Sequence, residues 1–221
     1  MGRLRKNLVN EAKLFSNNTY FIENPKALKG NWNKVFKNTN PIEIEIGSGK
    51  GLFIIQKAIC NPNINFIAID KFATVLFQIL KKIESYNKDN LNKLENIRII
   101  SIDAKQLSEC FVEKEIDKCY LNFSDPWPKK KHEKNRLTNI SYLQIYDLIT
   151  KDNSIVEFKT DNLSLYEYTK ITLQSNDYKI VYDNNDLYSD KENLKSNFPT
   201  EYEIKWVNKG TKINKIIFIT K

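Results

Sequence analysis

The chain lacks the long apolar segments that mark proteins of the membrane and of the secretory route. No apolar run approaches the roughly 18 residues that are needed to span a bilayer. The start of the chain carries Arg3, Arg5 and Lys6, but no apolar stretch of the kind found in secretory signals follows them. We therefore expect a soluble, cytoplasmic protein that makes no contact with a membrane.

Cysteine and histidine are scarce. Cys60, Cys110 and Cys119 are widely spaced, and none belongs to a Cys-x-x-Cys pair of the kind that binds zinc. His132 is the only histidine, and it has no neighbouring ligand residues. The sequence therefore predicts reduced, mostly buried thiols and no metal site.

Acidic residues are in the minority. Lysine and arginine number 35 against 27 for aspartate and glutamate, which gives a formal net charge of +8. Such an excess favours a polyanionic partner, but only if the positive charge lies where the chemistry occurs. The length of 221 residues fits one α/β domain. We expect a single domain over 1–221, with a basic and flexible N-terminal segment over 1–30.

Segments in which apolar residues have the spacing of a strand alternate along the chain with segments in which they have the spacing of a helix. Strands are predicted over 41–46, 65–69, 97–102, 118–123, 154–159, 178–182 and 215–220, and helices over 52–59, 75–83, 107–111, 140–149 and 163–174. This alternation predicts a doubly wound, Rossmann-like α/β fold with a mostly parallel, seven-stranded sheet. Ligands of such folds bind beyond the carboxyl ends of the strands.

Four acidic residues fall at or near the ends of the first four predicted strands. They are Glu45, Asp70, Asp103 and Asp125. A strand end often exposes a polar residue for no functional reason, but the fourfold recurrence favours a ligand site at this edge of the sheet.

A glycine-rich turn follows the first strand. Gly47, Gly49 and Gly51 let the backbone turn tightly and approach a ligand closely. Leu52 does not suit a dinucleotide-binding motif, and the spacing does not fit a P-loop. The remaining reading is an adenosine-type ligand without a pyrophosphate, such as S-adenosylmethionine; a purely structural turn is the alternative.

The acidic residues suit different parts of such a ligand. Asp70 lies about 20 residues beyond the turn, where a carboxylate accepts hydrogen bonds from ribose hydroxyls. Asp103 could address the adenine amino group, or it could cap a helix. Glu45 could support the glycine loop or meet the positive end of the cofactor, or it could be a surface carboxylate.

The segment over 121–138 joins a strand to a stiff turn and then to a cationic run. Pro126 and Pro128 restrict the backbone on either side of Trp127, which could stack on a base or pack under the loop. Five basic residues follow, namely Lys129, Lys130, Lys131, Lys134 and Arg136. A charge run is usually a solvated face, but its position directly after the turn favours phosphate binding.

Four motifs, over 45–51, 121–134, 158–162 and 200–203, together resemble those of bacterial tRNA (guanine-N7)-methyltransferases, in the same order. The resemblance implies a class I S-adenosylmethionine-dependent methyltransferase fold and methylation of the variable-loop guanine at tRNA position 46. It also implies the residues that contact the cofactor: Glu45, Gly47, Gly49, Gly51, Asp70, Asp103 and Asp125, with Asp125 also at the reacting end.

The resemblance implies two further sets of contacts. The target nucleotide would be engaged by Lys129, Asp161, Thr200, Glu201, Tyr202 and Glu203, and the RNA would be contacted by Lys131, His132, Glu133, Lys134, Asn135 and Arg136. Asn135 departs from the family pattern, which usually has a second arginine there. No obligatory protein partner is implied, and the protein is expected to be a monomer or a homodimer.

The chemistry of guanine limits the role of Asp125. Guanine N7 carries a lone pair and no proton, so a general base has nothing to remove there. We assign Asp125 to positioning and electrostatic support of the moving methyl group. Ionised Glu201 and Glu203 match the N1–H and N2–H donors of guanine, although Thr200 and Glu203 also fit a capping box. A non-catalytic RNA-binding protein and a nicotinamide-dependent oxidoreductase are the alternatives; the intact glycine turn with Asp70 and the presence of Leu52, respectively, disfavour them.

Overall fold

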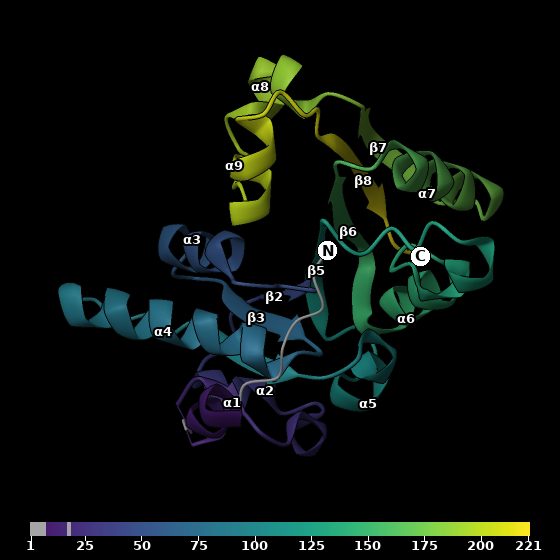
Figure 1. Ribbon diagram of the computed structural model, residues 1–221. Helices are drawn as coiled ribbons and strands as arrows, with labels where there is room; N and C mark the ends of the chain where they lie inside the picture. Colours follow the sequence, from purple (N-terminus) through teal and green to yellow (C-terminus); the bar gives the residue numbers. More distant parts are fainter. Residues whose placement is uncertain (1–7, 17–18) are drawn as a thin grey trace.

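The computed structural model describes residues 8–16 and 19–221, which form a sheet with helices on both faces (Figure 1). The strand order is β1-β4-β3-β2-β5-β6-β8-β7, and β8 runs antiparallel to its neighbours while all other pairs are parallel. The strands are β1 Phe21–Ile22, β2 Ile42–Ile46, β3 Asn65–Asp70, β4 Ile97–Ser101, β5 Ile116–Asn122, β6 Thr150–Thr160, β7 Lys179–Asn184 and β8 Asn214–Ile219. The seven predicted strands are all present, and the eighth is the two-residue β1 beside β4.

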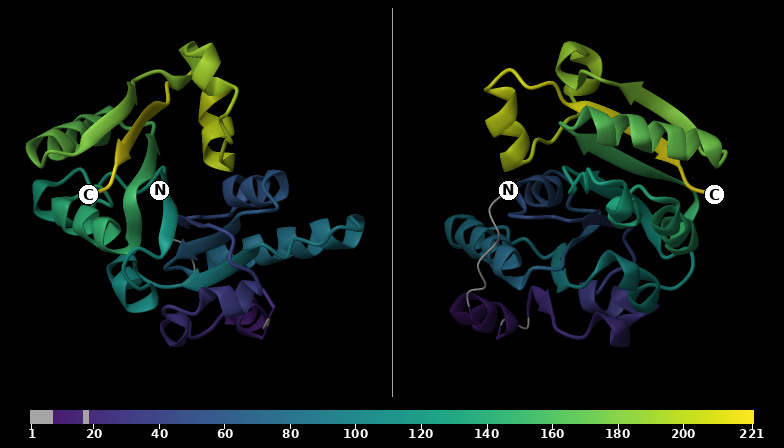
Figure 2. Two further views of the ribbon diagram at one scale, coloured as in Figure 1. Left: turned by 180° about the vertical axis from the view of Figure 1, so that it is seen from behind. Right: turned by 45° about the vertical axis from the view of Figure 1, so that its right-hand side comes forward.

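Two groups of helices cover the two faces of the sheet, as the views in Figure 2 also show. One face packs against α1 Leu8–Phe15, α3 Leu52–Cys60 and α4 Ala73–Asp89. The other packs against α2 Trp32–Phe36, α5 Leu107–Cys110, α6 Ile140–Ile149 and α7 Leu163–Ser175. The polar insertion before β8 forms α8 Lys191–Leu194 and α9 Glu201–Val207. No helix within the described ranges is long and apolar enough to cross a membrane.

Strand β2 shows how the alternation of the sequence becomes a two-sided core. Ile44 and Ile46 point into the cluster beneath α6 and α7, whereas Glu43 and Glu45 point to the opposite face and are also buried. A buried carboxylate needs hydrogen-bond partners. Glu43 accepts one from Tyr120 Oη at 2.7 Å, so this mainly apolar face of the sheet also buries paired polar groups.

The beginning of the described chain is built into the fold. Leu14 of α1 is fully buried against α4, and Phe21 of β1 pairs with Ile99 of β4. The structure thus gives regular elements to part of the segment over 1–30 for which flexibility was expected. Arg3, Arg5 and Lys6 lie outside the described residues.

The order of the strands defines where a ligand can bind. From β2, the chain builds outward through β3 and β4 on one side and through β5 and β6 on the other. Such a reversal leaves a crevice beyond the carboxyl ends of the two central strands. The glycine loop after β2 and the turn after β5 therefore face one another.

The three cysteines are free thiols. Cys110 and Cys119 are buried, whereas Cys60 is exposed. The prediction of mostly buried thiols is confirmed.

Gly51 tests how tightly the glycine loop is packed. Its φ is 78°, and an added Cβ would lie 2.6 Å from Ile79 Cγ1, whereas Gly210 has the same φ and open space around it. We expect Gly51→Ala to lower the free energy of unfolding by about 3 kcal/mol, from left-handed strain and overpacking together. Gly210→Ala should cost only about 1 kcal/mol. Urea unfolding measures both, and equal losses would contradict this packing.

Candidate active site

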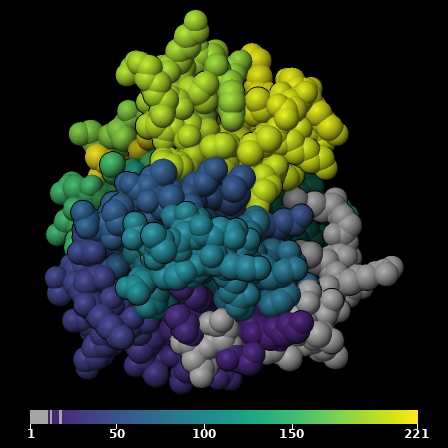
Figure 3. Space-filling model, turned by 90° about the vertical axis from the view of Figure 1, so that its left-hand side faces the viewer, coloured from purple at the N-terminus to yellow at the C-terminus, as the bar shows by residue number. Residues whose placement is uncertain are grey.

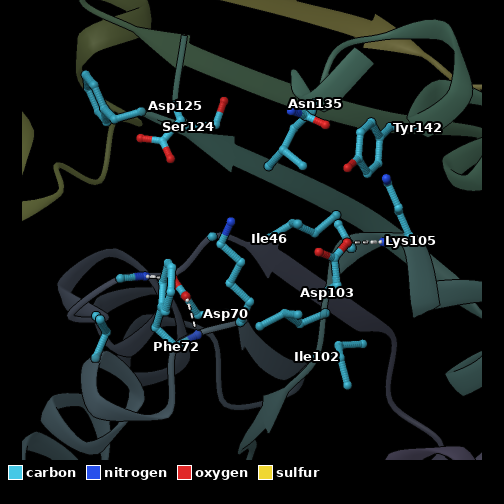
Figure 4. A pocket seen from close by; sticks show the side chains of 18 of the residues that line it. Ile46, Asp70, Phe72, Ile102, Asp103, Lys105, Ser124, Asp125, Asn135 and Tyr142 are labelled. Atoms are coloured by element: carbon cyan, nitrogen blue, oxygen red, sulfur yellow. Dashed lines mark hydrogen bonds between the residues drawn. The ribbon is translucent and has the colours of Figure 1, made fainter. Parts of the chain in front are cut away.

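A cavity of about 440 Å³ opens at the carboxyl ends of the central strands. This volume lies within the range of small-molecule sites. Figure 4 shows Asp70 and Phe72 on one side of the cavity and Ser124 and Asp125 across from them. Asp103 also lines it. Three of the four acidic residues expected at strand ends thus share one cavity.

The glycine loop is fastened to the end of β3. The N–H groups of Gly47 and Ser48 donate to Ile69 O at 2.8 and 2.9 Å, and Gly49 N–H donates to Asp70 Oδ2 at 3.2 Å. A Cβ at Gly47 or Gly49 would have no atom within 4 Å. The loop is therefore bonded to the end of β3, and the space beside Gly47 and Gly49 is open, so that a ligand can approach the backbone.

Asp70 is held by the backbone on both sides. Phe72 N–H donates to Asp70 Oδ1 at 2.9 Å, while Gly49 N–H occupies Oδ2. Burial raises the pKa of Asp70, and these two hydrogen bonds oppose the rise. Each oxygen keeps a further lone pair for a donor such as a ribose hydroxyl.

Asp103 caps a helical turn. Its Oδ1 accepts a hydrogen bond from Lys105 N–H at 3.0 Å, and Asp103 N–H donates to Gln106 Oε1 at 3.2 Å. This is the capping alternative that the sequence left open. Asp103 nevertheless lines the cavity, so its contact with an adenine amino group stays a prediction.

Glu45 is buried, which excludes the surface-carboxylate alternative. Its side chain is 1% exposed and lies on the face of β2 opposite Ile46, which lines the cavity. Asn122 Nδ2 donates to Glu45 Oε1 at 2.8 Å, whereas Oε2 has no partner. Burial raises the pKa of Glu45 to about 8, although Asn122 and Lys159 oppose the rise.

Two buried polar atoms at the end of β5 and in the turn after it also have no partner. They are Asn122 Oδ1 and Ser124 Oγ. Unpaired buried polar atoms are costly, and a bound polar ligand would satisfy them. The ammonium group of the methionyl end of S-adenosylmethionine fits this set chemically, because Glu45 Oε2 and Asn122 Oδ1 are unpaired oxygens that can accept a hydrogen bond.

The motif over 200–203 begins α9, and its two glutamates point to different parts of the protein. The predicted capping box is present, with Glu203 N–H donating to Thr200 Oγ1 at 3.0 Å. Glu203 is 0% exposed, and its carboxylate accepts hydrogen bonds from Lys159, Asn197 and Tyr188 at 2.6, 2.7 and 3.1 Å. The expectation that Glu203 meets a guanine edge is therefore not met in this structure. It anchors α9, because the capping box turns it inward onto buried Lys159.

Glu201 connects α9 to the glycine loop. It accepts a hydrogen bond from Leu52 N–H at 3.3 Å and forms an ion pair with Lys82, which also donates to Lys50 O at 2.8 Å. Figure 3 shows the C-terminal residues, in yellow, against the blue and teal residues of α3 and α4. Only part of the Glu201 side chain is exposed, so a base would have to compete with Lys82 for it.

Tyr202 and Asp161 lie beside the turn after β5. Tyr202 Oη donates to Asp161 Oδ2 at 2.8 Å, and the ring of Tyr202 is 5.2 Å from that of Phe123. The structure thus brings together Asp161 and the motif over 200–203, as the resemblance implied. Their contacts with a nucleotide stay predictions.

The turn after β5 has a strained backbone. Phe123 and Trp127 have φ values of 53° and 42°, in the left-handed region that side chains other than glycine rarely adopt. Asp125 and Trp127, which this turn carries, both line the cavity. Strain of this kind persists only where the surroundings hold it, and it is often part of a functional site.

The basic run divides into exposed and buried parts. Lys129, Lys130, Lys131 and Lys134 are exposed, whereas His132 and Glu133 are partly buried. Residues Lys130–Asn135 form a 3-10 helix. Asn135 turns toward the cavity in Figure 4.

Arg136 differs from the exposed lysines. It is 8% exposed and donates hydrogen bonds to Pro126 O at 3.0 Å and Trp127 O at 3.2 Å. Its predicted contact with RNA is therefore not supported, because the guanidinium is turned inward onto the protein's own backbone.

Sequence reasoning missed Asn122, Ser124 and Lys159. Asn122 and Lys159 are register partners on β5 and β6 and lie on the same face as Glu45. The two-residue period of a strand could have placed Asn122 with Tyr120 on a polar face. Nothing local marks Lys159 as buried, because its partner lies 44 residues away.

Solved structures and a family comparison define the class of protein. The 16S rRNA methyltransferase KamB superposes with a TM-score of 0.64 at 10% identity, and a 30S ribosomal A1408 methyltransferase from an uncultured bacterium with 0.57 at 16%; each comparison covers 87% of this chain and 93% of the other. A family model described as "Putative methyltransferase" matches residues 39–216. The fold is that of a class I S-adenosylmethionine-dependent methyltransferase, as predicted.

Closer relatives define the family. The tRNA (guanine-N(7)-)-methyltransferase of Malacoplasma penetrans is 49% identical over 98% of this chain and 97% of its own length. That of Geobacillus sp. is 41% identical, over 96% and 92%. The chain therefore belongs to the tRNA (guanine-N7)-methyltransferase family.

We expect the Glu45 carboxyl group to release its proton when the cofactor binds. The free carboxyl group holds a proton up to a pH of about 8, and a cationic group beside Oε2 would displace it. We expect calorimetric titration with S-adenosylmethionine at pH 7, in buffers of different ionisation enthalpy, to show release of up to about one proton per cofactor. The release should vanish in Glu45→Gln.

The neighbouring carboxylate provides the control. Glu43 lies on the same face of β2 but is paired with Tyr120, so Glu43→Gln should leave the proton release unchanged. Undiminished release from Glu45→Gln would contradict the assignment.

Proposed function

We propose that this protein transfers the methyl group of S-adenosylmethionine to N7 of the variable-loop guanine at tRNA position 46. One observation carries the proposal: a glycine loop and a strained turn with Asp125 meet at one cavity, next to a run of exposed lysines. Relatives that are 41–49% identical over nearly the whole chain are named tRNA (guanine-N(7)-)-methyltransferases. The activity in these names fits the chemistry of this cavity.

The cofactor would lie over the glycine loop. Gly47 and Gly49 leave room for close approach, and Gly51 lets the chain enter α3. Asp70 would accept hydrogen bonds from the ribose hydroxyls, and Asp103 would face the adenine. Bound there, S-adenosylmethionine supplies an electrophilic methyl group.

The target guanine would enter from the side of the turn. N7 attacks through a lone pair, so alignment and exclusion of water matter more than proton removal. Asp125 would orient the reacting groups and stabilise the positive charge as it moves onto the base. Lys129, Asp161 and Tyr202 lie around the turn and on α9, where they would hold the nucleotide.

The exposed lysines would hold the tRNA backbone. Lys130, Lys131 and Lys134 stand on or near one short helix directly after the turn. Phosphate neutralisation by such residues gives affinity without reading sequence. We propose that the protein acts in the cytoplasm and without an obligatory protein partner.

The activity can be tested with labelled S-adenosylmethionine and unmodified tRNA. We expect one labelled 7-methylguanosine per tRNA, mapped to position 46, since only a base in the reach of Asp125 is aligned. A transcript with 7-deazaguanosine at that position has no N7 lone pair, so it should bind normally and accept no label. Label at another base, or in the 7-deaza transcript, would overturn the proposal.

A further inference from the structure

Arg136 makes contacts unlike those of the other basic residues near the site. Its side chain donates from Nε to Pro126 O at 3.0 Å and from Nη2 to Trp127 O at 3.2 Å. The planar guanidinium presents two parallel donors, so it can hold two successive carbonyl groups at once. A lysine ammonium is a point charge and has no such fork.

The position of the guanidinium is itself fixed. Its carbon lies 4.2 Å from the centre of the Tyr168 ring on α7, and the Tyr168 hydroxyl accepts a hydrogen bond from Asn139 Nδ2 at 2.8 Å. Stacking of this kind suits arginine and is strengthened where water is excluded. In the part of the chain that the structure describes, no carboxylate forms an ion pair with Arg136.

The two carbonyl groups belong to the strained turn. Trp127 has a φ of 42°, and Phe123, where the turn begins, has a φ of 53°. Asp125 lies between them and lines the cavity across from Asp70 (Figure 4). A strained backbone relaxes unless its surroundings hold it, and Arg136 holds the two residues that follow Asp125.

We propose that Arg136 is a positioning residue for methyl transfer: stacked on Tyr168 of α7, it holds the Asp125 turn in place, as a brace, instead of contacting a tRNA phosphate. The inference rests on the proposed function and deepens it, because it separates the basic run into lysines that bind RNA and an arginine that orders the reacting turn. Loss of the brace lets Asp125 leave its place at the cavity. A misplacement of about 1 Å can lower a rate about 100-fold.

Two substitutions at Arg136 distinguish a brace from a phosphate contact. Arg136→Met removes both charge and fork, whereas Arg136→Lys keeps the charge and loses the fork. We expect both to lower the single-turnover rate about 100-fold at saturating cofactor and tRNA. The tRNA Kd should change less than about threefold, and the slope of log Kd against log salt should stay unchanged, because no phosphate contact is lost.

Lys131→Met is the matched control. It removes one exposed charge from the same short helix. We expect it to weaken tRNA binding and reduce the salt slope by about 1, with a normal rate at saturation.

Substitutions of the neutral residue Tyr168 test the same contact without altering Arg136, in case the variants at position 136 do not fold. Tyr168→Leu removes the ring beneath the guanidinium and should slow single-turnover transfer without altering the salt slope, whereas Tyr168→Phe should keep the rate. The urea unfolding midpoint and the far-UV circular dichroism spectrum confirm that each variant is folded.

The proposal is overturned if Arg136→Met behaves as Lys131→Met does, or if Arg136→Lys and Tyr168→Leu keep the wild-type rate. Label transfer by the wild-type protein is measured in parallel. Its absence would count against the proposed function, and normal wild-type transfer with unaffected variants would count against the brace alone.

Discussion

The parallel pairing of β2 with β5 is the constraint on which the site depends. Glu43, Ile44 and Glu45 stand in register with Lys118, Cys119 and Tyr120, so the two strands end side by side. The glycine loop after β2 and the Asp125 turn after β5 therefore line the same cavity. Because the chain builds outward in opposite directions from these two strands, a crevice opens between their carboxyl ends.

The second constraint is the polar face beneath α9. Lys159 and Glu203 are both almost fully buried, and burial lowers the pKa of Lys159 while the Glu203 charge opposes the fall. Removal of either partner would leave a buried charge without compensation. The pair thus fixes where α9 docks, and with it Glu201 against the glycine loop and Tyr202 against Asp161. The glycine loop, Asp161 and the motif over 200–203 are thus held as one unit.

The sequence was sufficient for the parts that depend on local pattern. Strands that are buried on both faces appear in the sequence as apolar runs, which end at Asp70 and next to Asp103. The glycine loop was recognised from the spacing of its glycines. The sequence was insufficient where the partner of a side chain lies far away in the chain or is a backbone group. The sequence favoured Glu203 as an acceptor for a base, whereas in the structure it is buried and paired with Lys159. Arg136 could not be distinguished from the neighbouring lysines, because its partners are backbone carbonyl groups, which no residue type in the sequence marks. The two-residue β1 carried no pattern at all.

Guanine N7 needs no base, so the central claim is that Asp125 acts by position and charge. The most direct test is the single-turnover rate of Asp125→Asn with saturating S-adenosylmethionine and tRNA, measured together with the tRNA Kd. Asparagine keeps the shape and loses the charge, and the account predicts a rate lower by about 100-fold or more with the Kd changed less than about threefold. A near-normal rate, or a loss confined to the Kd, would contradict it.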